Sequence, residues 1–212
     1  LPAAAVTSVV KREAVHALLD CDEDIDLVIP RGSNSLVRTI QANSRIPVMG
    51  HADGICHVYI DANANPAMAA RIAVDSKCDY PAACNAAESL LVHRDFLPHL
   101  GDVGDALTRA GVELRADSAA AGHLQQSVPA EESDGATEYG ALTLSVRVVD
   151  TVDEAIDRIH RCGSGHTESI VTDDTETAAH FLDCVDSASV FHNASTRFAD
   201  GFRYGLGAEV GI

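Results

Sequence analysis

The stretch Asp79-Tyr80-Pro81-Ala82-Ala83-Cys84-Asn85 follows an amphipathic apolar run and precedes a strand-like run, Leu90-Leu91-Val92. Pro81 predicts a break or the first turn of a helix, because proline favours the first helical position. A helix N-terminus lowers the pKa of a nearby thiol, and small neighbours would let a substrate carbonyl approach the Cys84 sulfur. A buried, unreactive cysteine gives the same local pattern, so the rest of the chain must decide.

Outward from this stretch, short apolar runs alternate with helical patterns. The runs predict strands at 26–30, 46–49, 56–60, 90–93, 112–114, 142–149, 169–171 and 189–191. Helices are predicted at 11–20, from a Gly-Ser turn to 41, and at 65–77, 96–110, 119–125, 152–162 and 175–184, with a surface loop at 126–135. This alternation is typical of an α/β protein with a largely parallel sheet. Hydrophobic continuity is weakest at Gly50 to Gly54, which predicts two domains, residues 1–50 and 51–212.

The charge of the chain excludes some partners. Its 15 Lys and Arg against 32 Asp and Glu give a formal net charge of −17. A surface this acidic repels nucleic acid and anionic membranes. No apolar run approaches the length of a membrane span. We therefore expect neither nucleic acid nor a membrane as a partner.

The six cysteines, at positions 21, 56, 78, 84, 162 and 184, form no CxxC pair. A reducing compartment fits them best, and we expect the cytoplasm, with an organelle left open because the chain begins at Leu1 rather than Met. His160, Cys162 and His166 lie close together, but no fourth ligand follows at zinc-finger spacing. We therefore expect no metal.

A second candidate site is the short turn Arg31-Gly32-Ser33 between the strand predicted at 26–30 and the following helix. A Gly-Ser turn that opens a helix presents free N–H groups and a positive dipole end, which suit a phosphate. An ordinary turn with a serine cap has the same sequence pattern.

Seven longer motifs give the chain a family resemblance. They lie at 27–33, 50–61, 79–91, 137–140, 185–187, 193–201 and 205–211, and include Gly50-His51-Ala52-Asp53-Gly54 and Tyr80-Pro81-Ala82-Ala83-Cys84. With these motifs the chain resembles the γ-glutamyl phosphate reductases of the aldehyde dehydrogenase superfamily. It looks most like the reductase half of the bifunctional Δ1-pyrroline-5-carboxylate synthetases.

The resemblance implies an aldehyde dehydrogenase-like α/β fold. Residues 1–50 would be the end of a dinucleotide-binding domain, and residues 51–212 an α/β catalytic domain without its C-terminal tail. The chain would then be a fragment, since such reductases carry further strands of the dinucleotide fold before Leu1. The full-length protein is expected to be a homo-oligomer, although we find no oligomerisation element here.

The resemblance also implies roles for single residues. Cys84 matches the nucleophile that forms a thioester with L-glutamyl 5-phosphate, and Asn85 follows it. NADPH then supplies hydride to give glutamate 5-semialdehyde in proline biosynthesis. The cofactor would meet Arg31, Gly32 and Ser33 at its pyrophosphate and Glu138 at its ribose. The substrate would meet Ser195, Thr196 and Arg197.

One absence separates reaction classes. Hydrolytic aldehyde dehydrogenases carry a glutamate base in the strand that matches 46–50, and this stretch has no carboxylate. A phosphate-using reductase needs no activated water, so this absence favours it over an aldehyde oxidase. A stand-alone reductase and a catalytically silent domain with an assembly role remain as alternatives. A cysteine hydrolase is disfavoured, because no motif ties a histidine to Cys84.

Overall fold

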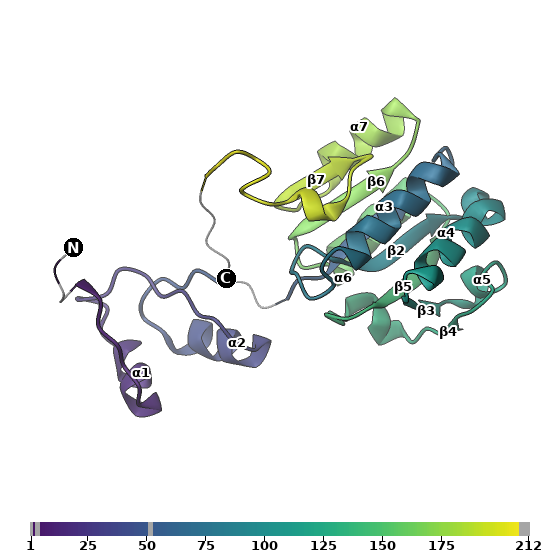
Figure 1. Cartoon of the computed structure of the whole chain (residues 1–212). Helices are drawn as coiled ribbons and strands as arrows, with labels where there is room; N and C mark the ends of the chain where they lie inside the picture. Colours follow the sequence, from purple (N-terminus) through teal and green to yellow (C-terminus); the bar gives the residue numbers. More distant parts are fainter. Residues whose placement is uncertain (1, 3–4, 51–52, 208–212) are drawn as a thin grey trace. The chain divides into compact units, whose positions relative to one another are not determined.

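The computed structural model describes residues 2, 5–50 and 53–207 (Figure 1). It consists of two compact units, one up to Asp53 and one from Gly54 onward. The predicted domain boundary falls between residues 50 and 51, and residues 51, 52 and 208–212 lie outside the described part. The two units are therefore considered one at a time.

The smaller unit contains helices α1 (Arg12–Leu18) and α2 (Asn34–Asn43). Ser33 caps α2, because its hydroxyl accepts a hydrogen bond from the Leu36 amide at 3.4 Å. The strands predicted at 26–30 and 46–49 are reduced to a single bridge between Val28 and Val48. The prediction of a buried strand at 26–30 was wrong, since Leu27 and Ile29 are 42% and 44% exposed. An apolar run does not itself supply the neighbouring strands and helices that bury it.

The larger unit is built on one seven-stranded, fully parallel sheet in the order β4-β3-β5-β2-β1-β6-β7. The strands are β1 (Cys56–Ile60), β2 (Ala87–His93), β3 (Glu113–Ala116), β4 (Val128–Pro129), β5 (Thr143–Val149), β6 (Thr167–Val171) and β7 (Ser189–His192). The predicted α/β class with a parallel sheet is thus confirmed.

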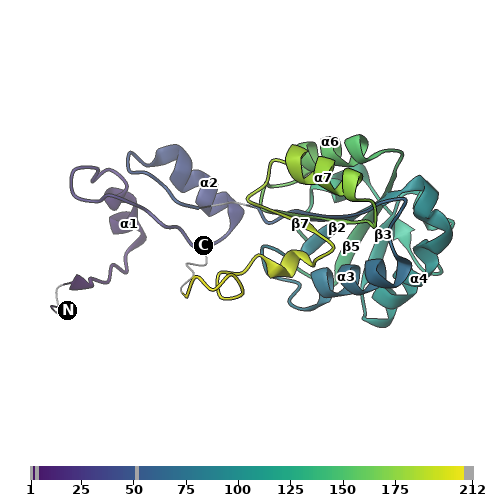
Figure 2. The same ribbon diagram turned by 90° about the horizontal axis from the view of Figure 1, so that it is seen from above.

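Helices cover both faces of this sheet (Figure 2). Helices α3 (Pro66–Cys78) and α4 (Leu97–Arg109) lie on one face, and α6 (Val152–Cys162) and α7 (Thr175–Cys184) on the other. Short helices connect the larger elements: α5 (Ser118–Ala121), η2 (Arg94–Phe96), η3 (Glu132–Ala136) and η4 (Thr196–Phe198). None of the helices in the described ranges is long and apolar enough to cross a bilayer.

The central strands divide their side chains between two cores. Val58 and Ile60 of β1 pack with α3 and α4, while Tyr59 between them packs with α6 and α7. Side chains on a strand point alternately to opposite faces, and both faces here are covered. This is why the runs Val58-Tyr59-Ile60 and Leu90-Leu91-Val92 are continuously apolar, whereas β5 alternates, as its sequence predicted for a half-buried strand. Each large side chain buried in this way stabilises the fold by about 1.5–3 kcal/mol.

Local signals fix the ends of most helices. The Asn65 side chain accepts from the Met68 amide at 3.1 Å, and Pro66 occupies the first helical position of α3. Thr151 and Asp174 cap α6 and α7 in the same way. The helix predicted at 119–125 is shorter than expected, because α5 ends at Ala121, just before Gly122.

The polar segment 126–135 was predicted to be a surface loop, but it also contains a short strand and a buried residue. Val128 and Pro129 form strand β4 at the edge of the sheet, where a proline without an N–H is tolerated. The following helix η3 buries Asp134, which a polar composition alone does not reveal.

Candidate functional site

Cys84 lies in two consecutive turns between α3 and β2. The Ala83 amide donates to the Tyr80 carbonyl at 3.0 Å, and the Ala86 amide donates to the Ala83 carbonyl at 2.9 Å. No helix begins at Pro81; of the two predicted alternatives, a break or a first helical turn, the break is the one that forms. Only eight residues separate Cys78 from Ala87, and turns already span that gap. We call residues 79–86 the Cys84 turn.

The start of β1 packs tightly against the backbone of Cys84. A Cβ added at Gly54 would lie 2.6 Å from the Cys84 carbonyl oxygen and 2.7 Å from its Cα. The Cys56 thiol donates to the same carbonyl at 3.3 Å. Burial raises the pKa of the Cys56 thiol well above its ordinary value, so this group remains a protonated donor. Cys84 itself is partly exposed.

Asn85 connects the Cys84 turn to residues 197–199. Its side-chain amide donates to the Ala199 carbonyl at 2.7 Å, and its Oδ1 accepts from the Arg197 guanidinium. The same guanidinium donates to Asp79 at 3.2 Å. Asn85 is only 5% exposed, so its amide holds two segments together.

The predicted substrate residues next to Arg197 face the protein interior. Ser195 is hydrogen-bonded to the Ser76 hydroxyl of α3 at 3.2 Å and accepts from the Arg197 amide at 3.2 Å. The Thr196 amide donates to Ser76 at 3.2 Å, and the buried Thr196 hydroxyl finds no partner among the described residues. These two residues pack the segment onto α3, while the Arg197 side chain is 15% exposed.

Glu138 lies exposed in the segment between η3 and β5. The two residues after it are fixed by carboxylates. The Tyr139 hydroxyl donates to Asp134 at 2.8 Å, and the Gly140 amide donates to Glu88 at 3.1 Å. Gly140 has φ of 58°, a left-handed conformation that favours glycine. The backbone that carries Glu138 is thus held in place, while its carboxylate faces solvent. We call residues 137–140 the Glu138 loop.

Asp134 anchors this loop through an unusually well-satisfied carboxylate. It accepts from the Glu131 amide at 2.7 Å, from Tyr139, and from Arg115 at 2.9 Å. Burial alone would raise the pKa of the Asp134 carboxyl, but these hydrogen bonds offset burial and bring its pKa below the ordinary value. Burial, together with the hydrogen bond to Asp134, raises the pKa of the Tyr139 hydroxyl.

The third predicted group, Arg31-Gly32-Ser33, belongs to the smaller unit. Ser33 caps the ten-residue helix α2, so the turn does open a helix. Gly32 has φ of 155°, a backbone conformation that L residues with a side chain rarely adopt, which explains the glycine. Arg31 is exposed. How this turn faces Cys84 stays a prediction.

Three segments of the larger unit lie at the amino-terminal ends of the strands. Gly54 precedes β1, the Cys84 turn precedes β2, and the Glu138 loop precedes β5, which are neighbours in the order β5-β2-β1. In open α/β sheets ligands usually bind beyond the carboxyl ends of the strands. This site therefore departs from the general rule.

Two site residues were missed at the sequence level. Lys77 and Glu88 are fully buried and lie 2.6 Å apart. Lys77 follows Ala69 and Ala73 at four-residue spacing, which places it on the buried face of α3, and Glu88 stands inside an apolar strand. The signal in the sequence was a charged residue at a position that the helix or strand pattern assigns to the core.

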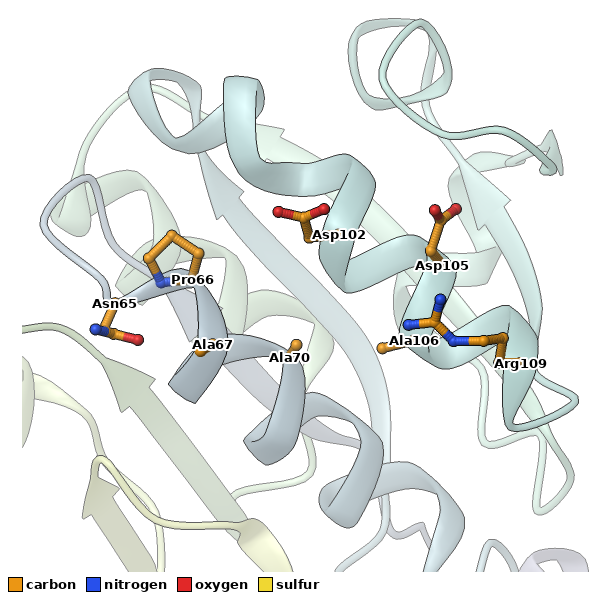
Figure 3. A pocket seen from close by; sticks show the side chains of 8 residues that line it. All are labelled: Asn65, Pro66, Ala67, Ala70, Asp102, Asp105, Ala106 and Arg109. Atoms are coloured by element: carbon orange, nitrogen blue, oxygen red, sulfur yellow. The ribbon is translucent and has the colours of Figure 1, made fainter.

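A groove of about 580 Å³ lies elsewhere, between α3 and α4 (Figure 3). It is lined by Asn65, Pro66, Ala67, Ala70, Asp102, Asp105, Ala106 and Arg109. Because it lies at the amino-terminal half of α3, whereas the Cys84 turn follows the carboxyl end, the groove is separate from the candidate site.

No metal cluster of three or more His, Cys, Asp or Glu side chains occurs within residues 2, 5–50 and 53–207. His160 accepts from the Asp186 amide at 3.1 Å, and His166 is 2.8 Å from the Thr167 hydroxyl. Both imidazoles thus take part in protein hydrogen bonds.

Comparisons with known proteins show which proteins the chain resembles. No protein-family model matches the chain. It is 55% identical over 212 residues to a γ-glutamyl phosphate reductase of Synechococcus sp. (strain JA-3-3Ab), covering all of this chain and 47% of the relative. It is 57% identical over 202 residues to that of Prochlorococcus marinus (strain MIT 9313), covering 95% of this chain and 46% of the relative. The chain spans about half the length of these curated relatives.

Solved structures agree on the fold. The γ-glutamyl phosphate reductase of Thermotoga maritima superposes with a TM-score of 0.92 at 38% identity, covering 95% of this chain and 49% of that one. The lactaldehyde dehydrogenase of Escherichia coli shares the fold with a TM-score of 0.69 at 17% identity, covering 85% of this chain and 48% of that one. With an aldehyde dehydrogenase-like fold and close to 55% identity along its whole length, the chain is a homologue of the γ-glutamyl phosphate reductases.

Proposed function

We propose that this chain works as part of a longer reductase that converts L-glutamyl 5-phosphate to L-glutamate 5-semialdehyde in proline biosynthesis. Its homology to γ-glutamyl phosphate reductases supports the reaction, and its coverage of 47% of a relative supports the longer protein. Below, "full-length reductase" means that longer protein. A kinase domain upstream, a homo-oligomer and the domain roles of residues 1–50 and 51–212 are part of the same proposal.

The observation that carries the proposal is the construction of the Cys84 turn. Gly54 packs against its backbone, and Asn85 and Asp79 contact residues more than a hundred positions later in the chain. Binding two other segments, at Gly54 and at residues 197–199, to one small turn fixes a partly exposed thiol in place, as covalent catalysis requires.

In the proposed reaction the Cys84 thiolate attacks the acyl carbon of the substrate. The bond from that carbon to the phosphate oxygen breaks, phosphate leaves with the bonding electrons, and a thioester remains. Hydride addition to the thioester carbon then breaks the C–S bond, which releases the semialdehyde and returns the thiolate. The Cys84 amide is a candidate donor to the developing oxyanion.

The hydride would come from NADPH, which supplies two electrons and one hydrogen when bound. The residues present fit such a cofactor in two respects. The amino-terminal end of α2, capped by Ser33, suits a pyrophosphate, with Arg31 and Gly32 beside it. The exposed Glu138 carboxylate can accept hydrogen bonds from two ribose hydroxyls.

For the substrate end we propose Arg197, held by Ser195 and Thr196. Its guanidinium can pair with a carboxylate while it contacts Asp79 and Asn85. The six free thiols support a reducing compartment such as the cytoplasm as the place of action.

With Cys184→Ser as a control that should stay active, because Cys184 is an exposed cysteine outside the Cys84 turn, the test is Cys84→Ala in the full-length reductase. We expect loss of NADPH oxidation by several orders of magnitude, no thioester in the mass spectrum, and unchanged NADPH binding. Cys84→Ser should be nearly as inactive. Substantial activity in folded Cys84→Ala protein would refute the thioester route. An inactive parent protein that folds and assembles normally would favour the silent domain.

A further inference from the structure

Lys77 and Glu88 form a buried ion pair on either side of the Cys84 turn in sequence. The Lys77 Nζ and the Glu88 Oε2 are 2.6 Å apart, and the side chains are 0% and 1% exposed. Lys77 lies in the last turn of α3, and Glu88 is the second residue of β2. Burial raises the pKa of the Glu88 carboxyl and lowers that of the Lys77 ammonium. Because desolvation opposes such pairs, stability alone does not account for this one.

The second oxygen of Glu88 points to another segment. Its Oε1 accepts from the Gly140 amide at 3.1 Å, and the Tyr139 amide also interacts with this carboxylate. One carboxylate thus contacts α3, which leads into the Cys84 turn, and the Glu138 loop.

We propose that Lys77 and Glu88 are a positioning pair that sets the Glu138 loop relative to the Cys84 turn. This inference rests on the proposed function, since it assigns Glu138 to cofactor binding. Neither residue touches substrate or cofactor; Glu88 acts through the backbone that carries Glu138.

The chemistry explains why the acceptor is charged. Both partners of Glu88, the Lys77 ammonium and the Gly140 amide, are hydrogen-bond donors without an acceptor to offer. A carboxylate can accept from both. A glutamine must turn its NH₂ group toward one of them, unless the lysine is removed as well.

This asymmetry gives a pair of matched variants in the full-length reductase. Lys77→Met with Glu88→Gln removes both charges but keeps an oxygen for the Gly140 amide. Lys77→Met with Glu88→Leu removes both charges and that oxygen, and an apolar pair of similar volume is well tolerated in a core. If the pair served only the stability of the fold, the two folded double variants would have the same affinity for NADPH.

We expect the Met/Gln variant to keep the dissociation constant for NADPH within about threefold of the parent. The Met/Leu variant should weaken NADPH binding by roughly tenfold or more, because it leaves the Gly140 amide without its acceptor. Asp61→Asn is the control, since Asp61 is a buried carboxylate at the carboxyl end of β1 that accepts from Tyr59 and Thr172. It should lower the melting temperature and leave NADPH binding unchanged.

Equal NADPH affinity in two folded double variants would overturn the proposal. Hydrogen exchange of the Gly140 amide gives a readout that does not depend on function: its protection should persist in the Met/Gln variant and fall in the Met/Leu variant. If the parent binds no NADPH, the proposed function fails, and the exchange result still decides whether the pair positions the loop.

Discussion

In the full-length reductase, Gly54→Ala should test whether the position of Cys84, the proposed nucleophile, limits the reaction. The new Cβ would lie 2.6 Å from the Cys84 carbonyl oxygen, whereas ordinary contacts begin at 3.4 Å. The two backbones must therefore move apart by about 0.8 Å. A displacement of about 1 Å at a reacting group can cost roughly 100-fold in rate. We expect about that loss in single-turnover thioester formation, with about 1–3 kcal/mol of stability lost to overpacking.

The assay measures thioester formation by rapid quenching and mass spectrometry, and NADPH binding in parallel. Gly104→Ala is the matched control, because its Cβ would crowd Leu124 Cδ2, at 2.3 Å, which is the flexible end of a side chain outside the Cys84 turn. NADPH binding should be unchanged in both variants. If the two variants form thioester equally fast, contact with Gly54 does not position Cys84 and the argument fails.

Three further outcomes are expected in the full-length reductase. Glu138→Gln should weaken NADPH binding and slow hydride transfer while thioester formation survives; unchanged affinity and turnover would return Glu138 to an ordinary surface role. Arg197→Lys should lower kcat about tenfold or more with NADPH affinity intact, because a lysine cannot donate to two partners in a fixed fork as Arg197 does; Arg109→Lys on the distant groove is the control, and equal effects would contradict the role. Asp134 has a lower pKa folded than unfolded, so the stability it contributes is present above about pH 4 and lost as pH falls through the folded pKa. Urea unfolding from about pH 3 to pH 7 should show that the free energy of unfolding falls less steeply toward low pH in Asp134→Asn than in the parent. An identical pH dependence in the two proteins would exclude this contribution.

Much of the larger unit follows from sequence. Helices α6 and α7 begin and end where predicted, because a Thr or Asp cap precedes each apolar helical pattern. Strands β1 and β2 were recognised because both faces are covered, which leaves continuous apolar runs such as Leu90-Leu91-Val92, and β5 was recognised from its alternation. In these elements local propensity and tertiary packing agree.

The errors have a common cause, which is that partners distant in sequence decide the outcome. The run Leu27-Val28-Ile29 is apolar, yet its burial depends on neighbouring elements that a local pattern does not contain. Pro81 fits a helix start as well as the turn that forms. Lys77 and Glu88 were missed because composition places charges at the surface, and only their pairing makes burial tolerable.

The hydrogen bonds that close the Cys84 turn also order events in time. Asn85 and Asp79 bond to residues 112–118 positions downstream, so the turn is complete only after residues 197–199 have been synthesised and docked. Contacts this distant along the chain form late, because loop-closure entropy opposes them until other parts have folded. A growing chain on the ribosome would therefore expose Cys84 in an unorganised loop. The proposed reactivity of Cys84 would develop only as residues 197–199 dock, which couples it to the folding of a segment made much later.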